Sequence, residues 1–415
     1  MMEDEESQTH LEPLEREFAE EWHPGTGNAR NVFAPWKEFV MSEKLLTSMV
    51  HIFYAIPPNW PRGSNWERIL PSIMAILIWL AFCMEMSIIK LLWTQGDQGH
   101  AANKHPPIGS VLLVILLELS STVSFTIMVI YFFKSSNRFH YSSTKLIPGF
   151  EFAPLGKHQD VTLKKVHWLG VNFFLVFAIT GLGTSLYNAM KVNIFFSFTD
   201  LHEFTKQISD VQRGLYYSTL VILNWAHMSS ILACGTFYIA CRSISSHIDF
   251  TEKLLVSHVT DFNSAKEIHE CLLKYSEKVI KSLTPWFTIH SSLLGLVILL
   301  TLLDIMSTIQ SSQKGHDISK IWLSKVTASW FVAIQFAFPF LSASLVTRRY
   351  EQMYEQLNRR ATNVTNCHEL DAFLNYCLRC KSGFYVLGIR ITTSHAVMSI
   401  ASVFIGLFRF YKELF

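Results

Sequence analysis

Ionisable side chains occur inside several of the longest apolar stretches of the sequence, where a charge is costly and usually has a function. Glu118 is the most deeply placed, beside Ser120, Ser121 and Thr122 in a run of Leu and Val. Such a carboxyl group can contact a ligand or hydrogen-bond to a neighbouring helix, and the sequence leaves both roles open. The others are Glu85, His227, His290, His395, and, near the ends of their stretches, Asp304, Arg390 and Arg409.

A polar stripe runs along the last apolar stretch, which otherwise consists mainly of Ile, Val, Met, Leu and Phe. Small residues in such a stripe let neighbouring helices pack closely, whereas water-facing polar groups line a conduction path. The pattern taken alone favours packing and leaves conduction open. The stripe residues recur every three or four positions, on one helical face: Thr392, His395, Ser399, Ser402, Gly406 and Arg409.

Aromatic and amide side chains gather near one end of several apolar stretches. Aromatic residues at membrane interfaces usually serve as anchors, and this interpretation is strongest for Tyr217. The deeper side chains suit a pocket for a small ligand, which needs aromatic walls and a few polar groups. The candidate ligand-binding residues are Glu118, Tyr187, Tyr217, Asn224, Trp225 and Trp330.

Signals for catalysis or metal binding are scarce. Three histidines in the apolar stretches could hold zinc, as in some seven-helix membrane hydrolases, but no His-x-x-x-His pair occurs there. Hydrogen bonding within the bundle is therefore the preferred interpretation for His227, His290 and His395. Cys377-Leu-Arg-Cys380, near Cys367 and His368, could also bind zinc, although free thiols are the simpler interpretation. We expect no enzyme, no bound metal and no cofactor.

Seven apolar stretches must position these residues, and each is long enough to cross about 30 Å of hydrocarbon as a helix. Half of the 415 residues are hydrophobic and only 16% are charged, which is typical of multispanning proteins. The sequence thus predicts an all-α polytopic membrane protein with seven transmembrane helices. The predicted spans are 69–93, 108–133, 166–190, 215–241, 284–306, 321–346 and 384–410.

Two segments precede the first span. Residues 1–38 are acidic and predict a cytoplasmic tail, before a seven-transmembrane domain over residues 39–415. Residues 39–56 form a shorter apolar stretch interrupted by charges and ended by Pro57 and Pro58. We interpret this stretch as an interfacial amphipathic helix, with a spanning helix as the alternative.

Basic residues predict the orientation, because they accumulate in cytoplasmic loops. The loops after spans two, four and six hold eighteen Lys and Arg residues, against six in the other three loops. The N-terminus is therefore predicted in the cytoplasm and the C-terminus outside, in a multi-pass protein of the plasma membrane. This orientation is opposite to that of a G-protein-coupled receptor. The inner loops predict helical extensions over 248–281, as one helix or two, and over 347–360 and 368–380.

The inverted seven-span topology, the long helical inner loops and the short C-terminus resemble the invertebrate gustatory receptors and their odorant-receptor relatives. Those receptors carry Thr-Tyr, five hydrophobic residues and Gln-Phe in span seven. Here Ser402-Val403, residues 404–408 and Arg409-Phe410 have the same layout, with Phe410 identical and Ser402 in place of Thr. The run from Phe384 to Gly388 is similar to the Phe-x-x-x-Gly opening of that span.

The resemblance implies a tetrameric ligand-gated cation channel, homomeric or heteromeric, with span seven lining the pore. A small molecule would bind on the outer side among spans two to six, and the inner helices would hold the subunits together. Arg409 is a departure, because four positive charges at the pore mouth would oppose cation entry. The alternatives are a G-protein-coupled receptor or an intramembrane zinc hydrolase; no nucleic acid partner is expected. The implied pore residues are His395, Ser399, Ser402, Gly406, Arg409 and Phe410.

Overall fold

The computed structural model describes Met49 and residues 52–54, 65–96, 108–133, 210–258, 262–312, 319–361, 372–377, 380, 383–386 and 388–414. All of these belong to one compact unit, Leu46–Phe415. The described part is helical apart from a two-stranded hairpin and the residues around it, which confirms the predicted all-α class. The predicted tail 1–38 and the predicted third span, 166–190, lie outside the described residues.

Helix α3 and helix α4 correspond to predicted spans one and two. Helix α3 covers Asn65–Gly96, and α4 covers Ile108–Ile127 before a π-helical turn, η1, at Met128–Phe133. One face of α3 is buried, at positions three or four residues apart as helical geometry requires. The residues of this buried face are Pro71, Ala75, Ile78, Ala81 and Glu85.

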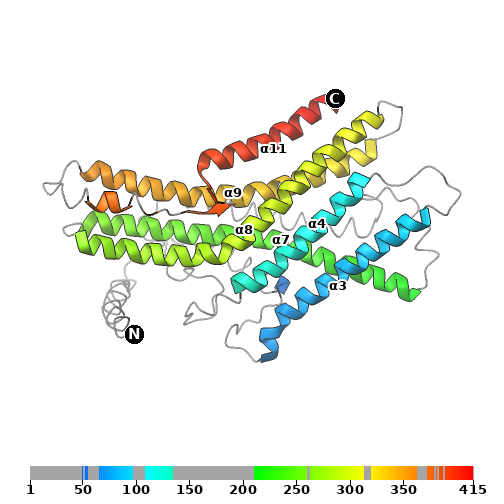
Figure 1. Cartoon of the computed structure of the whole chain (residues 1–415), viewed down its shortest axis with the longest axis horizontal. Helices are drawn as coiled ribbons and strands as arrows, with labels where there is room; N and C mark the ends of the chain where they lie inside the picture. Colours follow the sequence, from blue (N-terminus) through cyan, green and yellow to red (C-terminus); the bar gives the residue numbers. More distant parts are fainter. Residues whose placement is uncertain are drawn as a thin grey trace, which may run out of the picture. The chain divides into compact units, whose positions relative to one another are not determined.

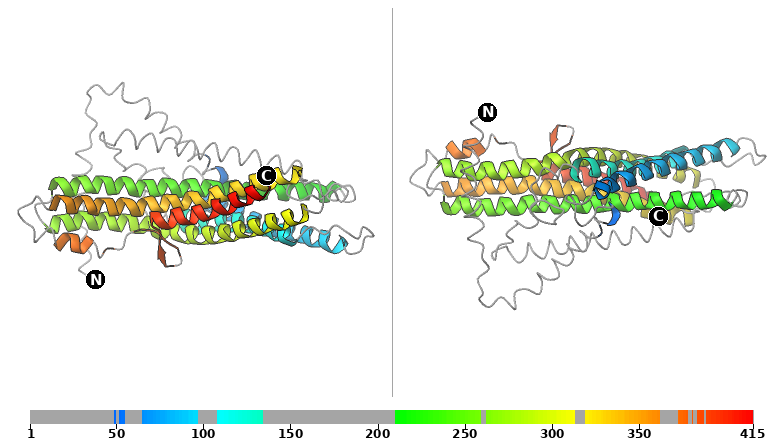
Figure 2. Two further views of the ribbon diagram at one scale, coloured as in Figure 1. Left: turned by 90° about the horizontal axis from the view of Figure 1, so that it is seen from above. Right: turned by 90° about the horizontal axis from the view of Figure 1, so that it is seen from below.

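Three long helices run side by side over much of their length (Figures 1 and 2). They are α7 at Asp210–His258, α8 at Phe262–Ser312 and α9 at Ser319–Ala361. At 1.5 Å per residue each is about 65–75 Å long, roughly twice the thickness of a hydrocarbon core. The predicted extension 347–360 is confirmed as part of α9. The segment 248–281 belongs to two helices, since α7 ends at His258 and α8 begins at Phe262.

Among the described residues, two helical stretches are long and apolar enough to cross a membrane: Ile69–Ser87 in α3 and Leu272–Leu303 in α8. A third apolar stretch, Ile115–Tyr131 in α4 and η1, is shorter. Predicted spans four, five and six are helical, as parts of α7, α8 and α9. The count of seven spans and their orientation remain predictions.

The prediction of one helix over 384–410 is wrong at its beginning. Residues Tyr385–Val386 (β1) pair antiparallel with Ile389–Arg390 (β2), and the helix, α11, covers Thr393–Leu414. Gly383 and Gly388 have φ angles of 135° and 81°, a conformation that L residues rarely adopt and that a helix excludes. The Phe384–Gly388 run therefore makes a hairpin and does not open the helix. With 22 residues, α11 is still long enough to cross a bilayer.

A buried aromatic cluster fixes the chain where it enters the hairpin. Phe384 is fully buried, with its ring centroid 5.0 Å from that of Phe237 on α7 and 5.9 Å from that of Phe287 on α8. A Cβ atom at Gly383 would lie 2.8 Å from Thr347 Oγ1 on α9, so the backbone there needs glycine. The last helix thus starts from a point held by all three long helices.

The described end of the predicted interfacial helix packs into the bundle. Tyr54 is fully buried, stacks on Phe125 of α4 at 4.9 Å, and donates a hydrogen bond to the Ser229 carbonyl of α7 at 2.7 Å. Sequence reasoning missed this contact, because the charges at 43, 44 and 51 dominate the pattern of the segment. Tyr54 holds the segment before span one against α4 and α7.

Candidate functional site

Helix α11 has one packed face and one exposed face. Ala396 is buried, and Val403 packs against an apolar cluster of α8 and α9 that includes Leu294 and Val332. On the other side, Met398 is 67% exposed and Ile405 is 60% exposed, with Ser402 between them. The exposed face of α11 therefore has no packing partner among the described helices of its own chain.

The predicted polar stripe lies toward this exposed face. His395 and Ser402 are exposed, and Thr392 and Ser399 are half-buried. The Ser402 hydroxyl donates to the Met398 carbonyl one turn earlier, at 2.8 Å, which satisfies it within the helix. Gly406, Arg409 and Phe410 also belong to α11, but their surroundings are outside the described part of the structure. The exposed stripe residues His395 and Ser402 are therefore not used for packing inside the subunit.

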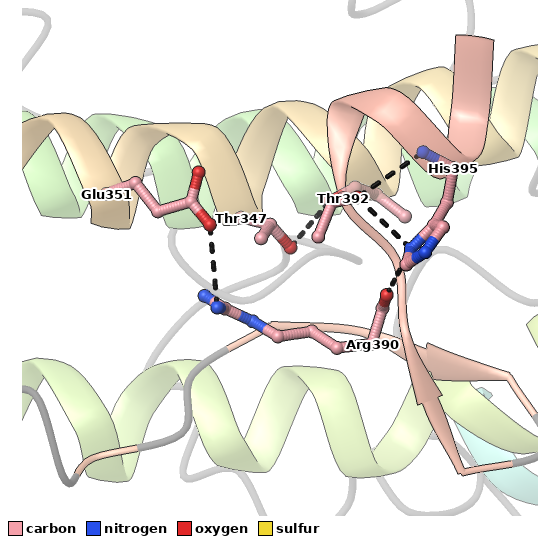
Figure 3. A network of polar contacts seen from close by, with 6 residues as sticks. Thr347, Glu351, Arg390, Thr392 and His395 are labelled. Atoms are coloured by element: carbon pink, nitrogen blue, oxygen red, sulfur yellow. Dashed lines mark hydrogen bonds and ion pairs between the residues drawn. The ribbon is translucent and has the colours of Figure 1, made fainter. Parts of the chain in front are cut away.

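A polar network ties the start of α11 to α9 (Figure 3). The Arg390 guanidinium lies 3.5 Å from the Glu351 carboxylate of α9. His395 Nδ1 lies 2.9 Å from the Arg390 carbonyl oxygen, so Nδ1 carries the hydrogen of that bond. The backbone N–H of His395 donates to Thr392 Oγ1 at 3.3 Å, which makes Thr392 the N-cap of α11. His395, a predicted pore residue, here orients the first turn of the helix.

The predicted pocket residues are only partly brought together. Trp225 on α7 donates its indole N–H to the Phe53 carbonyl at 2.7 Å, and the two rings lie 4.8 Å apart. Its described contacts are thus with the segment before span one. Asn224 is half-buried beside it on α7. Tyr187 lies outside the described residues. Tyr217 belongs to α7 and Trp330 to α9, but the side chains of these two residues are not described. The pocket therefore remains a prediction.

Glu118 has a closer companion than the predicted aromatic residues. The carboxyl groups of Glu118 on α4 and Glu85 on α3 lie near enough to interact electrostatically. One oxygen of each is buried without a hydrogen-bond partner. The structure therefore brings two ionisable residues of separate predicted spans together inside the bundle.

The histidines inside the bundle make hydrogen bonds, which confirms that interpretation. His227 Nδ1 lies 3.1 Å from Ser121 Oγ of α4, and His290 Nε2 lies 3.5 Å from Cys234 Sγ of α7. The His290 ring also stacks on Trp286 with centroids 4.5 Å apart. Within the described part of the chain, no group of three or more His, Cys, Asp or Glu side chains is placed to hold a metal ion.

Comparison with solved structures identifies the architecture. The structure is similar to that of the insect olfactory receptor OR5 from Machilis hrabei, with a TM-score of 0.51. The match covers 90% of this chain and 98% of that chain. The chain has the fold of an insect olfactory receptor. The two sequences are 12% identical, so the likeness is one of fold. No protein-family model matches the sequence, and no curated protein matches it.

The bundle of α7, α8 and α9 is tightly connected near residue 350. The Arg349 guanidinium of α9 forms an ion pair with Asp249 of α7. Tyr350 donates its hydroxyl to Ser276 of α8 at 2.6 Å, with both side chains buried. All three long helices are therefore joined by polar contacts beyond their predicted spans.

Residues 372–377 are helical, in part of the stretch predicted as the extension 368–380. Cys377 is buried, and burial raises the pKa of its thiol to about 12. Such a thiol stays protonated near neutral pH. Cys377 and Cys380 are both free, while Cys367 and His368 lie outside the described residues.

His269 on α8 makes the stability of this receptor fold sensitive to acid. Its ring is fully buried, with Nε2 3.1 Å from Tyr354 Oη and the ring packed against Phe373 and Tyr376. Burial lowers the pKa of His269 from 6.5 to about 4. Between these values the unfolded chain binds a proton that the folded chain does not, so stability falls as pH drops below 6.5. Each pH unit costs about 1.4 kcal/mol, or about 2 kcal/mol by pH 5.

Thermal unfolding of the detergent-solubilised protein between pH 7.5 and 5 measures this loss. The His269→Gln variant, which cannot titrate, is expected to lose less stability over the same interval. His395→Gln, which alters an exposed histidine, is the matched control and should keep the full pH dependence. Identical pH profiles for His269→Gln and the unaltered protein would show that His269 does not cause the effect.

Proposed function

We propose that this protein is a chemosensory, gustatory-receptor-like, ligand-gated cation channel whose pore is lined by α11. The observation that carries the proposal is the exposed polar face of α11 in a chain with an insect olfactory receptor fold. A helix that spans a membrane with Ser and His residues turned away from its own subunit needs either water or another subunit beside that face. A pore between several copies provides both.

The proposed assembly is a tetramer of identical or related subunits, as the family resemblance implies. The apolar Met398 and Ile405, which flank Ser402 on the exposed face, would contact the neighbouring subunits or lipid. Ser399 and Ser402 would then face the conduction path. The long-helix bundle, which extends well beyond the thickness of a bilayer, would hold the subunits together on the cytoplasmic side.

Gating would proceed through the connection between α9 and α11. A small molecule bound on the outer side shifts the population toward the open state only if it binds that state more tightly. Because Phe384 is anchored between α7 and α8, and Arg390 is paired with Glu351 of α9, movement of the long helices carries the start of α11 with it. This coupling needs no contact between the ligand and α11.

Currents recorded from cells that express the full chain test the proposal, and Arg409 provides a defined variant. Four Arg409 side chains near the outer end of α11 would oppose cation entry, so Arg409→Gln is expected to increase cation conductance. A barrier lowered by about 1 kcal/mol, the effect of one unit charge at 4 Å in water, raises the rate about fivefold.

The control for this variant is Arg359→Gln, which removes an exposed arginine paired with Glu355 on α9, outside the predicted spans. Its conductance should equal that of the unaltered protein. If Arg409→Gln also conducts like the unaltered protein, Arg409 lies outside the permeation path.

A further inference from the structure

Among the described side chains of α3 and α4, three oxygen atoms lack hydrogen-bond partners. They are Oε2 of Glu85, Oε2 of Glu118 and Oγ1 of Thr122, all buried. The Glu85 side chain is only 8% exposed, and Thr122 is not exposed at all. A buried polar group without a partner costs free energy, and a buried carboxyl group costs more than a hydroxyl. Three such groups on two adjacent helices call for a bound partner.

The three groups lie where α3 and α4 meet. Glu118, Thr122 and Thr126 are four residues apart and share one face of α4. This face meets α3, because the indole N–H of Trp79 donates to Thr126 Oγ1 at 3.0 Å. Glu85 continues the buried face of α3, and its carboxyl group interacts electrostatically with that of Glu118. Thr122 therefore lies on the face of α4 that meets the helix carrying Glu85.

The two carboxyl groups also lie at matching depths. Glu85 precedes the end of α3 at Gly96 by about three helical turns, and Glu118 follows the start of α4 at Ile108 by about three turns, roughly 15 Å in each case. These two ends are joined by residues 97–107, which the loop charges assign to the outer side. The pair therefore lies in the outer half of predicted spans one and two, next to the predicted pocket among spans two to six.

The apolar stretches nearest to this pair carry no basic residue, and Lys90 of α3 lies five residues beyond Glu85, toward the outer end of predicted span one. Residues 69–87, 108–133 and 215–241 contain no Lys and no Arg. Nearby Ser121 is already hydrogen-bonded to His227 and lies on the adjacent face of α4. Two buried carboxyl groups without a positive partner are costly inside a membrane, so a cation from outside would stabilise them.

The number and type of acceptors favour an ammonium group over a metal ion. An ammonium group of a primary amine has three N–H donors, which matches the three unpartnered oxygen atoms. A hard divalent metal ion requires about six oxygen ligands, more than these groups supply. Ile78 and Ala81, on the same buried face of α3 as Glu85, suit the hydrocarbon part of an organic amine.

We propose that Glu85, Glu118 and Thr122 form a binding site for the ammonium group of a small organic amine. This inference names the ligand class of the proposed receptor and depends on the proposed function only for its physiological meaning. In the amine complex, one ammonium group bridges the two carboxyl groups and donates a third hydrogen bond to the threonine oxygen. The hydrocarbon part of the amine occupies the apolar surroundings between the helices.

Equilibrium binding to the purified full-length protein in lipid nanodiscs tests the site. The probes are methylamine, butylamine and phenethylamine, each compared with its neutral analogue: methanol, butanol and 2-phenylethanol. At least one amine is expected to bind at least tenfold more tightly than its alcohol, since a hydrogen bond to a charged group contributes about that factor or more. Equal affinity of amine and alcohol across the series would overturn the proposal. So would a result in which Na⁺ stabilises the folded protein and none of the amines does.

Substitutions assign the binding to these residues. Glu118→Gln keeps the shape of the side chain and is expected to weaken the bound amine at least tenfold. Glu85→Gln should do the same, and Thr122→Val should weaken it several-fold. Glu277→Gln, at an exposed glutamate of α8 paired with Lys281, is the control and should leave amine affinity unchanged. Unaltered amine affinity in both Glu118→Gln and Glu85→Gln would overturn the proposal even if one variant folds poorly.

This binding assay separates the site from the channel. Amine binding without any ligand-evoked current would support the amine site and contradict the proposed channel function. If a neutral compound evokes currents and Glu118→Gln leaves them unchanged, the channel function is supported and the amine site is contradicted.

Discussion

Replacing Phe384 with alanine is expected to destabilise the folded protein by about 3 to 5 kcal/mol. The ring is fully buried and packs against Phe237 and Phe287, so its removal leaves a cavity that the surrounding aromatic rings cannot fill. The Phe384 carbonyl also accepts a hydrogen bond from the Ile391 N–H at 2.9 Å, which closes the hairpin before α11. Loss of the ring therefore frees the start of α11 and should also abolish ligand-evoked current.

The matched control is Ile389→Ala, which removes a side chain of the same hairpin that is 59% exposed. A surface change of this kind typically costs less than about 0.5 kcal/mol. Unfolding of both variants in detergent gives the comparison. Equal destabilisation by the two substitutions would mean that Phe384 does not anchor the hairpin.

The sequence predicted the long helices well, because their signals are redundant. In α9 the apolar residues of span six give way to a charged segment, 347–360, without Gly or Pro, and the helix continues through both. In 248–281, helical periodicity predicted one helix or two, and the structure has two. Hydrogen bonding was also predicted correctly for His227 and His290, because buried imidazoles without a metal-binding pattern need such partners.

The hairpin before α11 was missed for a physical reason. Phe384, Val386 and Ile391 are apolar, so hydropathy does not distinguish them from the first turns of a membrane helix. The distinguishing signal is local: glycines at 383 and 388 that adopt positive φ, on either side of a two-residue strand. The pairing of Glu85 with Glu118 was beyond the sequence too, since it depends on how α3 and α4 face each other.

Modification of a cysteine introduced at Ser402 is expected to reduce the current at least tenfold. Ser402 lies on the exposed face of α11, so a cationic thiol reagent that reaches position 402 in a pore places a fixed positive charge in the conduction path. An added barrier of about 1.4 kcal/mol accounts for a tenfold loss. Val403→Cys is the control, because Val403 is on the packed side of the same turn, against α8 and α9.

The most direct test of α11 as the pore helix compares the current before and after conducting channels are treated with a cationic methanethiosulfonate reagent. The unaltered protein, with its exposed Cys83, supplies the baseline for native thiols. The proposed pore predicts that Ser402→Cys loses at least nine-tenths of its current while Val403→Cys and the unaltered protein keep theirs. Full current in modified Ser402→Cys channels, with the thiol shown to have reacted, would place α11 away from the pore.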